Sequence, residues 1–108
     1  MDQTAISKEL NTFISLVTLD LPIRHIILFG SFAKNNGRSD SDIDLLVVGD
    51  FKKNAINDPT GALYDKYRDL KSPHELHVIG LNMDDYENKN DSITLSSIRN
   101  TGKVIFSS

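Results

Sequence analysis

Two aspartates separated by one residue, Asp42 and Asp44, form the pattern with the clearest chemical meaning in this chain. They stand at the start of an apolar run over 43–48, which is typical of a buried strand. Side chains two apart in a strand share a face, so we expect both carboxylates to lie close together beside an apolar core. Their mutual repulsion would be relieved by a divalent cation, and carboxylate oxygens suit magnesium. A solvated turn before the strand is the alternative for Asp42, and it accounts less well for Asp44.

A Gly-Ser pair, Gly30-Ser31, directly follows the preceding apolar run. Glycine lets the backbone turn tightly and lets a ligand come close. Ser31 is expected to begin a helical turn, whose free N–H groups favour phosphate, and Lys34 is near enough to reach the same anion. An ordinary turn is the alternative for this pair taken alone. Together with the two aspartates, the pair predicts a site that holds a nucleotide and a metal ion.

A third ligand is expected from the strand over 75–81, where Glu75 and His77 share a face by strand alternation. Either side chain could face the aspartate pair. We favour Glu75 as the third carboxylate, because a hard oxygen ligand suits magnesium and because it could also deprotonate an acceptor hydroxyl. For His77 the more common interpretation is a core histidine with one ring N–H satisfied.

Two other motifs are excluded. The spacing of Asp40, Asp42 and Asp44 matches the opening of an EF-hand loop, but Leu45 and Phe51 stand where that loop needs glycine and glutamate. The Gly30 turn is also not a P-loop, because no Gly-Lys-Ser/Thr follows it.

The composition fits one small domain over residues 1–108. The net charge of −3 does not favour nucleic acid as the main partner. The chain has no cysteine, which excludes a disulfide framework and Cys-based metal or redox sites. It shows neither a signal segment nor an apolar run of membrane-spanning length, so we expect a cytoplasmic protein with no membrane partner.

The elements that would position these residues follow from apolar periodicity and from Gly and Pro. A helix is expected whose apolar face covers residues 6–17, and Leu21-Pro22 stops it. Asp58-Pro59 is a good start for a second helix, which is expected to run to Leu70. The remaining expectations are a helical turn over 31–35, a loop over 51–58, short helices over 82–89 and 92–100, and strands over 26–29, 43–48, 75–81 and 104–106. This order predicts an α/β (α+β) fold with a mixed β-sheet packed against helices.

Gly30-Ser31, ten intervening residues and then Asp42-Ile43-Asp44 resemble the signature of the DNA polymerase beta-like nucleotidyltransferase superfamily. The chain is most similar to the minimal nucleotidyltransferases, and Phe32-Ala33-Lys34 resembles the pattern that follows Gly-Ser in them. The segment from Glu75 to Val78 resembles the third acidic strand of some members, although the family usually has aspartate there. The likeness runs from about residue 24 to residue 81.

The resemblance implies a single-domain nucleotidyltransferase fold. It implies that Gly30, Ser31 and Lys34 bind the triphosphate of ATP or another NTP, and that Asp42, Asp44 and Glu75 are catalytic and hold two Mg²⁺ ions. The implied reaction moves an NMP, expected to be AMP from ATP, onto an acceptor hydroxyl. The two metals would clamp the attacking and leaving oxygens of an in-line displacement.

The resemblance also implies a partner, because minimal members commonly pair with a small helical protein of the HEPN class. They act there as antitoxins of a toxin–antitoxin system, some by transferring AMP to a tyrosine of the toxin. Two alternatives stay open: a binding module that neutralises its partner by contact, and a degenerate domain that only binds a nucleotide. The chain is also compatible with a homo-oligomer.

Overall fold

The computed structural model describes residues 6–30, 32, 42–72, 74–88, 98 and 100–108. The elements in chain order are α1 (Ser7–Thr18), β1 (Ile23–Phe29), β2 (Ile43–Gly49), the short 3-10 helix η2 (Lys52–Asn54), α2 (Pro59–Tyr67), β3 (Leu76–Asn82), α3 (Met83–Asn88) and β4 (Lys103–Ser107). The predicted turn over 31–35 and most of the predicted helix over 92–100 lie outside the described residues.

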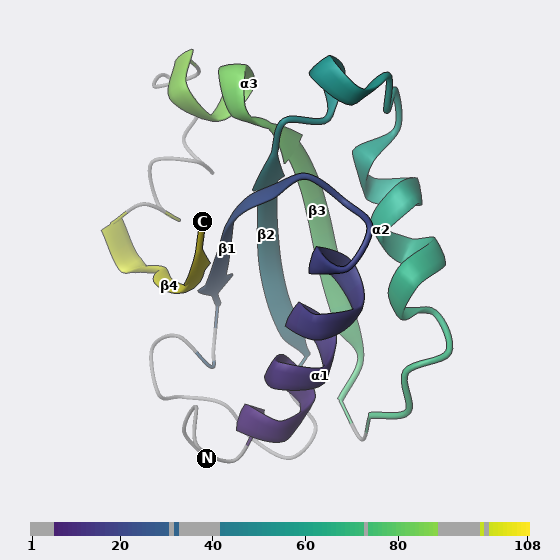
Figure 1. The fold of residues 1–108 in the computed structure, drawn as a ribbon. Coiled ribbons are helices and arrows are strands. Elements are labelled where there is room, and N and C mark those ends of the chain that lie inside the picture. Colours follow the sequence, from purple (N-terminus) through teal and green to yellow (C-terminus); the bar gives the residue numbers. More distant parts are fainter. Residues whose placement is uncertain (1–5, 31, 33–41, 73, 89–97, 99) are drawn as a thin grey trace.

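The sheet has the strand order β3-β2-β1-β4. Strand β1 is antiparallel to both β2 and β4, whereas β2 and β3 run parallel (Figure 1). The predicted α/β class, with a mixed sheet packed against helices, is therefore confirmed. The parallel pair has a direct consequence for the site, because it brings the beginnings of β2 and β3 to the same edge of the sheet.

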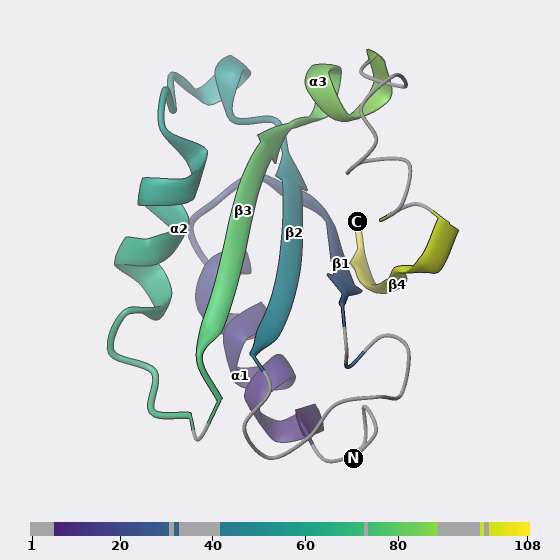
Figure 2. The same cartoon turned by 180° about the vertical axis from the view of Figure 1, so that it is seen from behind.

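Each face of the sheet carries its own apolar cluster. One cluster joins α1 and α2 to the sheet, and its fully buried members include Phe13, Leu45 and Leu63. The other is smaller, is built around Leu46 and Val48, and takes in partly buried side chains of α3. Figure 2 shows β2 and β3 from the side opposite α1. Strand β2 is thus apolar on both faces, as its nearly unbroken hydrophobic sequence predicts.

Helix α2 begins as its sequence predicts. The Asp58 carboxylate caps it by accepting a hydrogen bond from the Gly61 N–H at 3.1 Å, and Pro59 fills the first helical position. The helix start then rests on β3, because the Gly80 N–H donates to Thr60 Oγ1 at 3.0 Å. A Cβ at Gly80 would come within 2.8 Å of the Pro59 backbone, so glycine permits this close approach.

The loop predicted over 51–58 is wrong in its first half, where η2 forms one 3-10 turn. Phe51 is fully buried and anchors the turn, and its carbonyl accepts hydrogen bonds from the Asn54 and Ile56 N–H groups. The polar sequence hides this turn because its stability comes from one buried ring rather than from a periodic face.

Candidate active site

The candidate site lies at the sheet edge where β1 ends and β2 and β3 begin. Asp44 of β2 is directly opposite Phe29 of β1 on one side and His77 of β3 on the other. It is the one residue of β2 that is not fully buried. A carboxylate is therefore fixed on a strand whose other residues belong to the apolar interior.

Gly30 lies against this carboxylate and has a left-handed backbone with φ +74°. A Cβ at this position would overlap with Asp44 Oδ2, so only glycine allows the chain to leave β1 so close to Asp44. The sequence predicted a close approach here, and the structure gives its physical reason. The other two residues predicted to bind phosphate, Ser31 and Lys34, lie outside the described residues.

The His77 side chain lies among all three predicted carboxylates. Its Nε2 is 3.3 Å from Asp42 Oδ2 and 3.9 Å from Glu75 Oε2, while its Nδ1 is 3.8 Å from Asp44 Oδ1. The side chain is 52% exposed. The interpretation of His77 as a core histidine is therefore wrong, because its position on β3 points it to the open edge of the site rather than to the interior.

Glu75 reaches the same place from just before β3. Its carbonyl accepts a hydrogen bond from the Ile43 N–H at 2.8 Å, which ties the beginnings of the two parallel strands together. Its side chain is 75% exposed. Ligand atoms of Asp42, Glu75 and His77 all lie within 4.8 Å of one another, so these three side chains could hold one metal ion.

The electrostatics at Asp44 favour a bound cation. Burial raises the pKa of the Asp44 carboxyl, the nearby His77 partly offsets that rise, and the charge of Asp42 adds to it. Raised pKa values of this kind are common at functional sites, where a carboxylate binds a positively charged partner. Carboxylate oxygens with one imidazole nitrogen are a donor set that divalent metals accept, so the residues present could hold a divalent metal ion.

A contact between two rings joins the Gly30 turn to the segment that carries Glu75. Phe32 and His74 are both buried, and their ring centroids are 5.1 Å apart in an edge-to-face arrangement. Sequence reasoning missed this link. Its only signal is an aromatic residue two positions after a strand-ending glycine, which an ordinary turn would explain equally well.

A family model described as "Polymerase beta, Nucleotidyltransferase" matches residues 11–108. The chain belongs to the polymerase beta nucleotidyltransferase family. Nucleotidyltransferases typically use divalent metals, and the acidic cluster of this nucleotidyltransferase domain is a candidate site for them.

The crystal structure of a proposed nucleotidyltransferase from Sulfolobus solfataricus has a similar fold. The TM-score is 0.66 and the sequence identity is 17%, over 97% of this chain and 83% of that chain. At this identity the likeness supports the nucleotidyltransferase fold and nothing finer. A comparison with curated proteins gives no match. Within the part of the chain that the structure describes, no helix is long and apolar enough to cross a membrane.

Proposed function

We propose that this domain transfers a nucleoside monophosphate, expected to be AMP from ATP, to an acceptor hydroxyl in a reaction that depends on a divalent metal. The observation that supports it best is the position of Asp44, whose partly desolvated carboxylate lies between Gly30 on one side and the His77 ring on the other. Family membership supports the transferase class.

Each residue has a role in this proposal. Asp42, Asp44 and Glu75 would hold Mg²⁺. Asp42 and Glu75 lie in one group of potential ligands with His77, and Asp44 Oδ1 lies 3.8 Å from His77 Nδ1. When bound, the cation would neutralise negative charge on the reacting phosphate. On the other flank, the Gly30 backbone would allow the triphosphate to come close, with Ser31 and Lys34 as its further ligands.

The transfer itself is an in-line displacement at the α-phosphorus. The acceptor oxygen forms a new bond to phosphorus while the bond from phosphorus to the bridging oxygen of the β-phosphate breaks. Pyrophosphate leaves with that electron pair. Glu75 would accept the acceptor's proton, because its carboxylate is the most exposed of the three and stands on the side away from Gly30.

For the biological role we propose an antitoxin of the minimal nucleotidyltransferase type, which modifies a tyrosine of a small helical partner of the HEPN class. The support is the sequence resemblance described above. In this role the domain would act in the cytoplasm, and the partner would supply the acceptor hydroxyl.

The decisive experiment incubates the full chain with ATP labelled at the α-phosphate, MgCl₂ and the candidate partner, and measures labelled protein together with released pyrophosphate. Asp44→Asn should lower transfer at least about 10–100-fold, the loss that is typical even for groups that only support a metal ligand. Asp50→Asn is the matched control, because Asp50 follows β2 at its opposite end and pairs with Arg24 at 3.4 Å. Absence of transfer with any nucleotide and metal would contradict the proposal.

The same variants separate catalysis from simple binding. If Asp42→Asn and Asp44→Asn still neutralise the partner completely, the domain acts by contact, and transfer is not its main function. If the variants bind ATP but the unaltered chain releases no pyrophosphate, the protein is a degenerate domain that only binds a nucleotide.

A further inference from the structure

His77 is placed differently from the other two histidines that the structure describes. His25 Nδ1 is 2.8 Å from Ser107 Oγ, in a hydrogen bond that joins β1 to β4. The His74 ring is buried against Phe32, with the ring centroids 5.1 Å apart. The His77 ring is half exposed instead, and carboxylate oxygens lie 3.3 Å from its Nε2 and 3.8 Å from its Nδ1. This ring is therefore placed as a ligand rather than as a part of the core.

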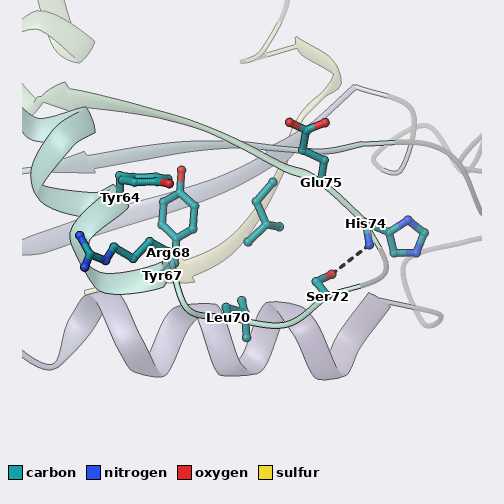
Figure 3. Close-up of a pocket in the computed structure, with 8 residues that line it drawn as sticks. Tyr64, Tyr67, Arg68, Leu70, Ser72, His74 and Glu75 are labelled. Carbon is teal, nitrogen blue, oxygen red and sulfur yellow. Dashed lines mark hydrogen bonds between the residues drawn. The ribbon is translucent and has the colours of Figure 1, made fainter.

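The spacing around His77 Nε2 matches a tetrahedral metal site. Nitrogen and oxygen ligands at about 2.0–2.2 Å from a tetrahedral ion lie about 3.3–3.6 Å from one another. Nε2 is 3.3 Å from Asp42 Oδ2 and 3.9 Å from Glu75 Oε2. The Glu75 side chain is 75% exposed, so it is free to rotate and shorten the second distance. Figure 3 shows the Glu75 carboxylate and the neighbouring His74 ring pointing in different directions, and only Glu75 belongs to the cluster of potential ligands.

The other ring nitrogen of His77 faces Asp44. Strand pairing sets the two residues opposite each other, and Nδ1 is 3.8 Å from Asp44 Oδ1. A metal-bound imidazole almost always directs its second N–H at a carboxylate, a carbonyl or water, which fixes the tautomer and the orientation of the ring. Asp44 is placed to receive that N–H, and the lone pair of Nε2 is then left for an ion.

One imidazole in the ligand set changes which ions the site favours. Mg²⁺ prefers oxygen ligands in octahedral geometry, and it is usually held by one or two carboxylates together with substrate phosphates. Imidazole nitrogen suits Zn²⁺ and related transition-metal ions, and three protein ligands with one open position are the usual set of a reactive zinc site. The set of Asp42, Glu75 and His77 therefore favours such an ion over Mg²⁺ when no nucleotide is bound.

We propose that Asp42, Glu75 and His77 bind one transition-metal ion of the zinc type without a nucleotide, and that they bind it more tightly than Mg²⁺. Mg²⁺ remains the ion that accompanies the triphosphate, on the flank of Asp44 where Oδ2 lies against Gly30. Asp42 can serve both ions, because a carboxylate offers two oxygens. The inference deepens the proposed function by naming a second class of ion, and it rests on that function only for the use of the ions in transfer.

Binding is tested by titrating the full chain with ZnCl₂ and, separately, with MgCl₂, in the absence of nucleotide. One Zn²⁺ should bind per chain, more tightly than Mg²⁺. His77→Asn should weaken Zn²⁺ binding about 10–100-fold or more, since even groups that only support a metal ligand are worth that much, and it should leave Mg²⁺ binding nearly unchanged. His25→Asn is the matched control, because it removes an imidazole outside the cluster and should not affect Zn²⁺ binding.

Proton–nitrogen NMR of the imidazole rings gives a readout that a merely structural role of His77 would not move. Zn²⁺ is diamagnetic, so the ring nitrogens can be followed as ZnCl₂ is added. His77 Nε2 should shift to the position of a metal-bound nitrogen while Nδ1 keeps its hydrogen, and MgCl₂ should not produce this shift. Loss of these signals in His77→Asn assigns them to His77.

Three results would overturn the inference: Zn²⁺ binding no more tightly than Mg²⁺, equally tight Zn²⁺ binding in His77→Asn, or a metal-bound shift at His25 or His74 instead of His77. The first would show a site governed by its carboxylates alone. The other two would show that Zn²⁺ binds elsewhere on the chain.

A transfer assay keeps the two proposals apart. If Asp44-dependent transfer from ATP occurs with Mg²⁺ but Zn²⁺ binding does not depend on His77, the metal inference fails and the transferase function stands. If Zn²⁺ binds through His77 but no nucleotide and no metal ion supports transfer, the transferase function fails and the metal inference stands.

Discussion

At the residue scale, the site combines groups that disfavour one another when no cation is present. Asp44 has its charge partly desolvated, faces the charge of Asp42, and is only partly compensated by His77. A folded chain that raises the pKa of a carboxyl favours its protonated form. The ionised form therefore destabilises the fold, and the effect depends on pH.

Asp44→Asn should accordingly raise the melting temperature of the metal-free protein at pH 7. Both side chains are neutral below the ordinary aspartate pKa of about 3.9, so the advantage is absent there. It grows as pH rises towards the raised pKa of the folded state and is constant above it. Thermal unfolding in EDTA at pH 3.5 and pH 7 tests this. Equal melting temperatures at pH 7 would contradict it.

Magnesium should reverse the order of the two melting temperatures, so that the unaltered chain becomes more stable than Asp44→Asn. Binding to the native state alone stabilises a protein by about 2.7 kcal/mol when the ligand is at 100 times its Kd. The unaltered chain should gain this stabilisation as MgCl₂ is added, whereas Asp44→Asn should gain less. The comparison therefore separates the metal site from a general effect of salt on the fold.

His77 stands where strand pairing places a residue directly opposite Asp44. A carboxylate at that position would add a hard oxygen ligand, so His77→Asp should tighten Mg²⁺ binding about tenfold, within the range by which groups at a metal site change affinity. Titration calorimetry with MgCl₂ measures it, and His77→Asn is the matched control without the added charge. Weaker Mg²⁺ binding in His77→Asp than in His77→Asn would show that this position is not a ligand position.

At the element scale, the sequence predicts those features that depend on local periodicity. The alternation of a strand placed Asp42 and Asp44 on one side, and both do approach the His77 ring. Strand alternation alone does not separate Glu75 from His77, because they share a face, and the preference for Glu75 rests on ligand chemistry alone. The parallel pairing with β2 settles which of them faces Asp44, and that pairing is a long-range property.

A pocket of about 230 Å³ between the end of α2 and the beginning of β3, lined by Tyr64, Tyr67 and Leu76, could not be predicted from the sequence either. Apolar spacing marks Tyr67 as a residue of a buried helix face, and it does pack on the core. Its place in the wall of the pocket depends on how closely α2 approaches β3, which the Gly80–Pro59 contact and the Thr60 hydrogen bond determine. The helices and strands that carry the site could be predicted from local sequence patterns, whereas the packing between them could not.

Loss of the cap at the start of α2 should thus destabilise the helix that lines the pocket. Asp58→Ala removes the cap on the Gly61 N–H and should lower the free energy of unfolding by about 1 kcal/mol. Asp58→Asn keeps a capping oxygen and should be nearly neutral. Urea unfolding of both variants provides the measurement. An equal loss in the two would mean that the charge of Asp58, rather than its capping bond, stabilises the helix.

At the scale of the whole molecule, one continuous core connects helix α1, helix α2 and one face of the sheet. The buried ring of Phe13 contacts Tyr67, Tyr67 contacts Tyr64, and Tyr64 lines the pocket. Core packing and the shape of this pocket are therefore linked through a chain of three rings.

This linkage predicts a coupling that a double-mutant cycle can measure. Phe13→Leu and Tyr67→Leu should each destabilise the protein, by amounts within the usual range of about 0.5–3 kcal/mol. Because their rings touch, the double variant should deviate from additivity by about 0.5–1.5 kcal/mol. Phe13→Leu paired with Val104→Ala is the control cycle, since Val104 is 61% exposed on β4 and belongs to neither described core cluster; this pair should be additive. Phe13→Leu should leave Mg²⁺ binding unchanged, because Phe13 belongs to the core cluster and not to the acidic cluster. Additive behaviour of Phe13 with Tyr67 would show that the wall of the pocket is independent of the core.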